Sequence, residues 1–200
     1  MKFFSINSLV FAAALVFVAV ALGGRASDVM ANSAPILPHD SPYDLSFIDM
    51  MLMHHGHGIE MAQLAESKST LPQLKKFAMR ISADQGKDTT ALQRYRDRFY
   101  ANDRKADKMR MGTMTMTAAE MQRMSYIDMN KLKEASGSDF NQLFIDIFTK
   151  HHQMAIQMSQ DAQKNAEHAE VKEFARMTIT KQGKDIREMD QMKRNIRKRA

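Results

Sequence analysis

The feature that most constrains this chain is an internal duplication in which each copy carries two consecutive histidines. The first copy spans residues 47–61 and the second spans residues 144–158. Their register continues without a gap beyond the histidines, because the segment Gln-Gly-Lys-Asp at 85–88 recurs at 182–185. A repeat of this kind predicts two copies of one supersecondary unit that share a hydrophobic core.

Histidine and methionine recur at helical spacing in both copies. Side chains at positions i, i+3, i+4 and i+7 lie on one face of a helix. This face carries Met50, His54, His57 and Met61 in the first copy, and His151, Met154 and Met158 in the second. Imidazole nitrogen and thioether sulfur are soft or borderline donors, so each stripe predicts a site for copper, above all Cu(I), rather than for magnesium or calcium.

The second histidine of each pair needs a separate explanation. Adjacent residues lie about 100° apart around a helix, so His55 and His152 cannot point, unaided, at the same inner spot as the histidines that precede them. They could bind an adjacent metal ion, orient the other ligands, or bond to a carboxylate on a neighbouring helix. Asp49 and Asp146 precede the pairs by five residues and could orient an imidazole, although a solvated helix face explains them equally well.

Two alternatives to copper binding start from the same residues. Methionine fills irregular core gaps, and the chain has 19 of them, so one alternative is a structural bundle of the cell envelope without metal. The other is a ferritin-like iron-binding protein or metal oxidase. Such di-iron bundles use inward Glu residues and a Glu-x-x-His pattern, which is absent here, and Glu60 is replaced by Gln157 in the second copy. An iron site is therefore disfavoured.

Other kinds of site are excluded or lack a signal. The chain has no Cys, which excludes disulfides, thiolate zinc sites and cysteine-ligated clusters. No set of nucleophile and base residues is recognisable, so we expect a binding protein rather than an enzyme. The net charge is +6, and the last residues, 193–199, are strongly basic. Because the charges are otherwise interspersed, we expect no nucleic-acid partner, and membrane contact only through an uncleaved leader or this basic end.

The N-terminal part of the chain predicts export. A lysine at position 2 precedes an apolar run at 9–22, and small residues follow it, which is typical of a secretory signal peptide. We place the signal peptide at 1–26, with cleavage as late as 31 as the alternative, followed by a flexible lead-in at 27–42. The run is short for a full membrane span, so we expect a periplasmic or secreted protein.

The remaining sequence predicts helices throughout. A first helix pair at 43–100 begins after a cap at Ser41 and continues beyond a capping box at 70–73. A methionine-rich connection and a bridging helix follow at 101–137; the helix is capped by a box at 117–120 and closes near residue 137. A second helix pair at 138–200 begins with a cap at Ser138. Because helices with short connections pack as antiparallel neighbours, we expect an all-α four-helix bundle plus the bridging helix. No segment shows a sustained strand pattern.

The connection itself holds further soft donors. Met111, Met114 and Met116 follow one another at a spacing of two or three residues, which is not a helix face. Thioethers on such a segment can attract a soft metal ion, or they can pack over one end of the bundle.

The paired motif resembles a known family. The pattern Phe47-Ile48-x-Met50-x-x-x-His54-His55, its repeat from Phe144, and the methionine-rich segment between them resemble the CopM-like proteins, which are exported, helical, often described as ferritin-like and once catalogued as a domain of unknown function. The resemblance implies a copper-binding protein in copper resistance. The ligands that it implies are His54, His55 and Met61, and His151, His152 and Met158.

The sequence departs from the family pattern at two places. Asp88 and Asp185 stand where the family usually has Glu, and Leu92 of the first repeat corresponds to Met189 of the second. The two sites are therefore expected to differ. Our prediction is an exported, ferritin-like bundle that binds Cu(I), and Cu(II) through histidine, for sequestration or transfer to and from copper proteins of the envelope. Free imidazole has a pKa of about 6.5, so we expect partial copper loss below that pH.

Overall fold

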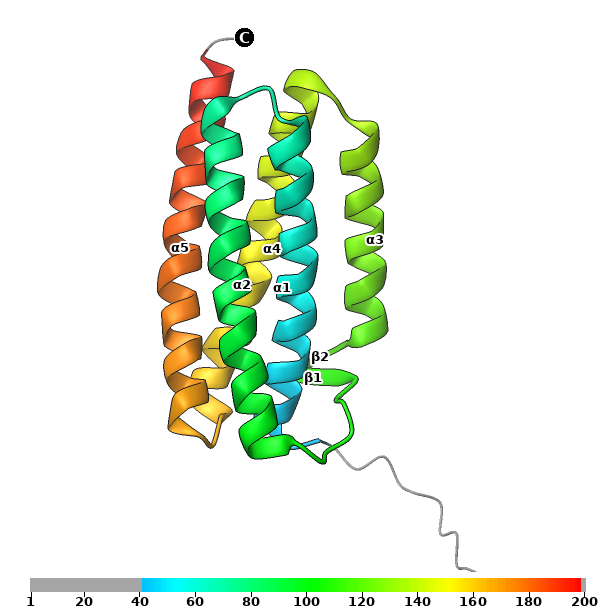
Figure 1. Cartoon of the computed structure of the whole chain (residues 1–200), viewed down its shortest axis with the longest axis vertical. Helices are drawn as coiled ribbons and strands as arrows, with labels where there is room; N and C mark the ends of the chain where they lie inside the picture. The colour runs from blue at the N-terminus through cyan, green and yellow to red at the C-terminus, as the bar shows by residue number, and fades with distance from the viewer. Residues whose placement is uncertain (1–40, 199–200) are drawn as a thin grey trace, which may run out of the picture. The chain divides into compact units, whose positions relative to one another are not determined.

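The computed structural model describes residues 41–198, and within them it contains five helices and one two-stranded sheet (Figure 1). The helices are α1 (Tyr43–Lys68), α2 (Pro72–Tyr100), α3 (Ala118–Glu134), α4 (Gly137–Asn165) and α5 (Ala169–Arg197), and the strands are β1 (Lys108–Met111) and β2 (Met114–Thr117). The predicted signal peptide and the lead-in up to residue 40 lie outside the described residues. In the described part, no helix combines the length and apolar character needed to cross a membrane.

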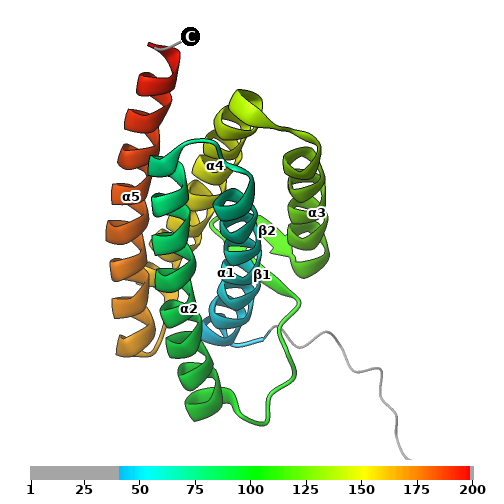
Figure 2. The ribbon, with the colours of Figure 1, turned by 45° about the horizontal axis from the view of Figure 1, so that its top comes forward.

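Four of these helices form the predicted bundle. Short loops at 69–71 and 166–168 turn α2 back along α1 and α5 back along α4. Helix α1 contacts both α2 and α4, and α5 contacts both α4 and α2, which closes the four helices into a ring. Helix α3 lies outside this ring against α1 and α4, as Figure 2 shows. The all-α four-helix prediction is confirmed.

The apolar core is split into two clusters that occupy opposite ends of the bundle. One joins the first half of α1 to the second half of α4, with Phe47 and Met158 among its buried side chains. The other joins the second half of α1 to the first half of α4, with Met61 and Phe144. The first half of one helix packs against the second half of the other because α1 and α4 are antiparallel. The histidine pairs lie in the middle of α1 and α4, between the two clusters.

The methionine-rich connection forms a β-hairpin, and the expectation of no strand was wrong. Strands β1 and β2 pair antiparallel, with Lys108 opposite Thr117 and Met111 opposite Met114. Gly112 begins the two-residue turn with a φ of 59°, a left-handed conformation that glycine adopts without strain. Alternate methionines lie on one side of a strand, because side chains in a strand repeat every two residues. The two-residue spacing of the methionines, which excludes a helix face, is the spacing expected of a strand.

The predicted helix caps had mixed outcomes. The capping box of α3 is confirmed: Thr117 Oγ1 accepts a hydrogen bond from the Glu120 backbone, and Glu120 bonds back. The caps at Ser41 and Ser138 and the box at 70–73 were wrong, because the residues at the N-caps of α1, α4 and α2 are Pro42, Ser136 and Leu71, and none of them makes a side-chain cap bond. A shift of one or two residues moves each hydroxyl away from the orphan N–H groups.

Candidate metal centre

His54 and His151 meet at the centre of the bundle. Their rings stack with centroids 3.6 Å apart and planes 24° apart. Nε2 of His54 lies 3.0 Å from the His151 carbonyl oxygen, and Nε2 of His151 lies 3.1 Å from the His54 carbonyl oxygen. The two contacts are equivalent under the duplication and hold α1 against α4.

These contacts determine which nitrogen of each ring is free. A carbonyl oxygen can only accept a hydrogen bond, so Nε2 of both rings must carry the hydrogen. Nδ1 of His54 and of His151 then holds a lone pair, and both atoms are buried without a partner. A buried nitrogen with an unused lone pair is costly unless something binds to it. Nδ1 is thus the atom through which each of these rings could hold a metal ion.

The second histidine of each pair faces a carboxylate on a neighbouring helix. Nε2 of His55 lies 3.9 Å from Asp88 on α2, and Nε2 of His152 lies 3.5 Å from Asp185 on α5. One of the three roles left open from the sequence, contact with a carboxylate, therefore describes the geometry. Both contacts exceed normal hydrogen-bond length, and the ring nitrogens of His55 and His152 have no hydrogen-bond partner. We call the four rings of His54, His55, His151 and His152 the histidine centre.

Each carboxylate also pairs with a cation, although the two cations do not occupy equivalent positions in the repeat. Lys181 of α5 bonds Asp88 at 2.9 Å, and Arg80 of α2 bonds Asp185 at 2.9 Å. Each aspartate thus links a histidine of its own repeat to a cation of the other repeat. Asp49 and Asp146 do not reach an imidazole: Asp49 accepts hydrogen bonds from Arg96 and the Ala106 backbone, and Asp146 pairs with Lys193.

The protonation of the centre follows from its burial. Burial, reinforced by the neighbouring histidines, holds the pKa of His54 and of His151 well below the ordinary imidazole value. Burial also lowers the pKa of His152, although Asp185 opposes this. For Asp88 and Asp185, burial acts to raise the pKa, but the histidine and the cation beside each carboxylate outweigh it and lower the pKa. At neutral pH the three imidazoles are uncharged and the carboxylates are ionised.

Two buried glutamines complete the centre, and the sequence analysis did not single them out. Gln85 of α2 and Gln182 of α5 are equivalent in the repeat, and their side chains contain buried atoms without a hydrogen-bond partner. A Cβ built on Gly58 would overlap Gln85 Oε1 and lie 2.9 Å from His151 Cε1, so Gln85 and His151 converge where α1 lacks a side chain. The recurrence of Gln in the duplicated Gln-Gly-Lys-Asp segment is the sequence feature that could have identified them.

The structure places the methionines of the first stripe in different apolar clusters and those of the second stripe in one. Met50 and Met158 are buried in the cluster that contains Phe47, and Met61 is buried in the other cluster. Met154 is partly buried beside the first cluster. Met51, which was not predicted, is fully buried one turn before His54 and His55, at the position that Phe148 takes in the second repeat. Phe148 packs against His151 and His152, with centroids 5.5 Å and 4.7 Å away.

The remaining candidates are not among the four rings of the histidine centre, although His57 is close enough to His54 to help lower its pKa. His57 is partly buried on α1, and burial lowers its pKa. Met111, Met114 and Met116 lie on the hairpin. Across residues 41–198, no three side chains among His, Asp and Glu gather into a group that could hold a metal ion. The rings of His54 and His55 have centroids 6.1 Å apart, and those of His151 and His152 are 6.2 Å apart.

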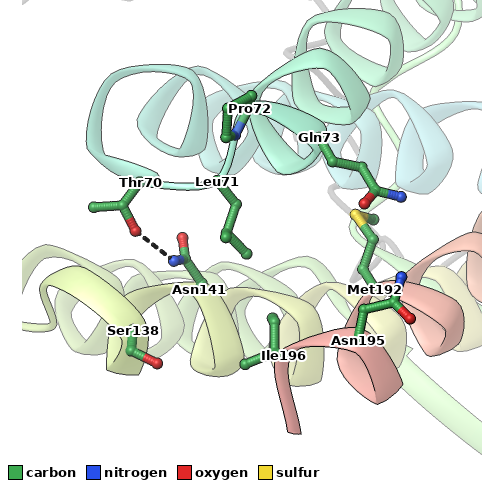
Figure 3. A pocket seen from close by; sticks show the side chains of 9 residues that line it. All are labelled: Thr70, Leu71, Pro72, Gln73, Ser138, Asn141, Met192, Asn195 and Ile196. Atoms are coloured by element: carbon green, nitrogen blue, oxygen red, sulfur yellow. Dashed lines mark hydrogen bonds between the residues drawn. The ribbon is translucent and has the colours of Figure 1, made fainter. Parts of the chain in front are cut away.

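Two hollows differ in their relation to the centre. A hollow of about 220 Å³ between α2 and α5 is lined by both glutamines and both aspartates of the centre, with Arg80 and Lys181 at its edge. A hollow of about 400 Å³ lies at one end of the bundle, where α2 and α4 begin and α5 ends (Figure 3). There Asn141 donates a hydrogen bond to Thr70. The first hollow is lined by residues that flank the histidine centre, but by none of its four imidazoles, whereas the second is lined by neither.

The chain has relatives among families and solved structures. A family model described as a domain of unknown function, DUF305, matches residues 44–193. The structure is similar to CopM in the Cu(II)-bound form, with a TM-score of 0.63 and 30% identity over 76% of this chain and 96% of that chain. It is similar to CopM in the Cu(I)-bound form, with a TM-score of 0.60 and 28% identity over 76% and 96% of the two chains.

A more distant relative shares the fold. A DUF305 fragment from Deinococcus radiodurans has a TM-score of 0.65 and 19% identity over 79% of this chain and 99% of that chain. No curated protein matches the sequence. The similarities therefore cover nearly the full length of the solved relatives.

Proposed function

This chain belongs to the DUF305 family, and we propose that it is an exported protein that binds copper, as Cu(I), at the histidine centre. The observation that carries the proposal is the set of buried imidazole nitrogens without hydrogen-bond partners on His54, His55, His151 and His152. A fold that buries ring nitrogens of four histidines without partners in one place is under-satisfied, and an ion bound to their lone pairs would complete it. The solved copper-bound forms of the similar protein CopM support copper as that ion.

The charge of the centre favours a monovalent ion. The imidazoles with lowered pKa are neutral, so they solvate an ion without cancelling its charge. The cost of burying an ion grows with the square of its charge, and is already large for a monovalent one. Cu(I) therefore suits this site better than Cu(II), Zn²⁺ or Fe²⁺, and imidazole is a suitable donor for copper. Cu(II) binding through the same imidazoles is expected to be weaker.

The spacing within each pair also suits one ion per pair. A metal–imidazole bond is about 2 Å long, and an ion bound between two rings separates their centroids by roughly twice that length plus the distance from each nitrogen to its ring centre. The centroid separations of 6.1 Å and 6.2 Å are compatible with this requirement. We therefore expect two ions, one for His54 with His55 and one for His151 with His152.

We further propose that the bound copper is held or handed on rather than used in catalysis. The hollow beside Gln85 and Gln182 flanks the centre with polar side chains, and the two aspartates that line it are ionised. Such a polar approach suits uptake and release. Sequestration and transfer both serve copper resistance in the cell envelope, and export follows from the signal peptide expected at 1–26.

The test is a Cu(I) titration against a chromophoric Cu(I) chelator under anaerobic conditions. Two variants remove one pair each: His54→Gln with His55→Gln, and His151→Gln with His152→Gln. Each should lose one equivalent of Cu(I) while circular dichroism shows an intact helical fold. His168→Gln, whose ring bonds Asp44 at the end of the bundle, is the matched control and should keep full stoichiometry. Unchanged stoichiometry in both paired variants would refute binding at the histidine centre and favour a purely structural bundle.

A further inference from the structure

The hairpin carries a second set of soft donors, away from the histidine centre. Met109 pairs with Met116 across the two strands, and Met111 pairs with Met114. Directly paired residues point to the same side of a sheet, and so do alternate residues of one strand. All four methionines therefore lie on one face of the hairpin, which we call the methionine face.

Core packing does not account for the whole methionine face. Met109 is 1% exposed and belongs to an apolar cluster, whereas Met114 is 61% exposed at the end of the hairpin. Met111 is 9% exposed and belongs to the same cluster, and Met116 is partly buried against it, so Met114 is the exposed member of the face. The four methionines thus range from exposed, at Met114, to buried against the bundle. An exposed thioether gains little from packing.

The hairpin is held firmly in this orientation. The backbone N–H of Gly112 in the turn donates to Asp161 Oδ1 of α4 at 3.1 Å, and the hydroxyl of Tyr43 donates to Asp161 Oδ2 at 2.7 Å. At the other end, the Ala118 N–H donates to the Asp107 carbonyl oxygen at 2.7 Å. The turn is thus fastened to α4, and the open end of the hairpin is closed by a bond between the residues next to its two strands.

Three of the sulfur atoms can reach one ion. Directly paired residues have Cβ atoms about 4.5–5.5 Å apart and diagonal neighbours about 7–8 Å apart. Met111 and Met114 are directly paired and Met116 is the diagonal neighbour of Met111. Each side chain has three rotatable bonds and a polarizable sulfur at its end. The sulfurs can therefore converge on a point beside the turn without moving the backbone.

We propose that Met111, Met114 and Met116 form a thioether site for a soft monovalent ion, Cu(I) or Ag(I), at the surface of the hairpin. Thioethers are uncharged and soft, so such a site selects these ions over Zn²⁺, Mg²⁺ and Ca²⁺. Asp161 lies on α4 three residues after Met158 and seven after Met154, so the hairpin docks on the helix face that leads back to His151. If the hairpin passes the ion on to the histidine centre, that step rests on the proposed function. The hairpin site itself does not.

The experiment uses Ag(I) as a redox-inert probe and protein labelled with ¹³C at the methionine methyl groups. Single Met→Leu substitutions assign the signals. Adding Ag(I) should shift the methyl signals of Met111, Met114 and Met116 together, and leave those of Met79 and Met177, which are exposed elsewhere, in place. Signals of the hairpin methionines that stay unmoved when Ag(I) is in excess would overturn the proposal.

A stoichiometry measurement separates this site from the histidine centre. The variant Met111→Leu/Met114→Leu/Met116→Leu should bind one Ag(I) fewer than the unaltered protein, because leucine conserves volume but not the donor. Met79→Leu/Met124→Leu/Met177→Leu, which removes three exposed methionines outside the hairpin, should bind the full number. Equal stoichiometry in the two triple variants would overturn the hairpin site. Loss of one equivalent in the hairpin variant upholds it even where the paired histidine variants show that the centre binds nothing.

Discussion

The rings of His54 and His151 stack 3.6 Å apart, and each Nε2 reaches the carbonyl oxygen of the other residue. This reciprocal contact joins the two repeats at equivalent positions, so one pair of residues both fastens α1 to α4 and orients the free Nδ1 atoms. Stability and metal affinity are therefore coupled at this point. A change that separates the two rings is expected to alter both.

Gly58 tests this close approach. A Cβ at this position would overlap Gln85 Oε1 and lie 2.9 Å from His151 Cε1. The Gln85 amide can rotate aside, but the His151 ring is held by its hydrogen bond to His54. We expect Gly58→Ala to lower the free energy of unfolding by about 1–3 kcal/mol, as overpacked core substitutions do, and to weaken Cu(I) binding. Urea unfolding measures the first effect and chelator competition the second.

Gly56 provides the matched control, because it lies on the same helix and nothing stands within 4 Å of a Cβ built there. Gly56→Ala should stabilise the protein by about 0.5–1 kcal/mol, since alanine is the better helix former. Equal effects of the two substitutions would contradict the steric role assigned to Gly58.

The metal-free protein should lose stability in mild acid. The pKa values of His54, His151 and His152 are lowered by burial, whereas in the unfolded chain they return to about 6.5. Near pH 6.5 the unfolded chain therefore binds protons that the native state does not bind. The free energy of unfolding is at its full value above about pH 7.5 and falls as the pH drops through 6.5. Each imidazole contributes a slope of up to about 1.4 kcal/mol per pH unit.

Urea midpoints at pH 7.5, 6.5 and 5.5 measure this loss. Asp88 and Asp185 act in a separate window: their lowered pKa values stabilise the native state above about pH 4, and that contribution is lost only below it. The variant His151→Gln/His152→Gln should show a shallower fall between pH 6.5 and 5.5. A midpoint that does not change over this interval would contradict the neutral state assigned to the imidazoles.

Several features could be predicted from the sequence because they are local or repeated. Helices α1, α2, α4 and α5 follow from periodic apolar residues, and the capping box of α3 is contained within four residues. The duplication also located the histidine pairs at equivalent places. The hairpin was missed because its methionines were tested only against helical spacing, although their two-residue alternation is that of a strand.

Other features could not be predicted because they depend on how the repeats pack. The contact of His55 with a carboxylate was one of three options, but its partner, Asp88, follows only from the packing of α2 on α1. Likewise, the Nε2 contacts of His54 and His151 join residues 97 positions apart. The first stripe was drawn on one helix face, and its methionines Met50 and Met61 belong to different apolar clusters because these clusters occupy the two ends of the bundle.

Bound copper should persist to a lower pH than a free imidazole would allow. Protons compete with copper for nitrogen lone pairs, and burial holds the pKa of His54 and of His151 well below the ordinary value. The structure thus moves the expected loss of copper from about pH 6.5 to lower values. Chelator competition at pH 7.5 and 6.0 should give Cu(I) affinities that differ by less than about threefold, where a free imidazole would lose roughly 75% of its neutral form. A larger fall with the helical fold intact would contradict this.

The buried carboxylate of Asp44 should fasten one end of the bundle more strongly than its equivalent, Asn141, fastens the other. Asp44 accepts hydrogen bonds from the backbone N–H groups of Glu167 and His168 and from His168 Nδ1, at 2.8–2.9 Å. Asn141 accepts from Ser69 and donates to Thr70. Asp44→Asn replaces one carboxylate oxygen by an NH₂ group, which then faces an N–H donor of Glu167 or His168. The free energy of unfolding, measured in urea, should fall by about 1–3 kcal/mol. The comparison is between Asp44→Ala and Asn141→Ala. The first leaves two backbone N–H groups and His168 without their acceptor, whereas the second removes two hydrogen bonds between uncharged groups and should cost less. The opposite order would show that the carboxylate does not hold the loop between α4 and α5.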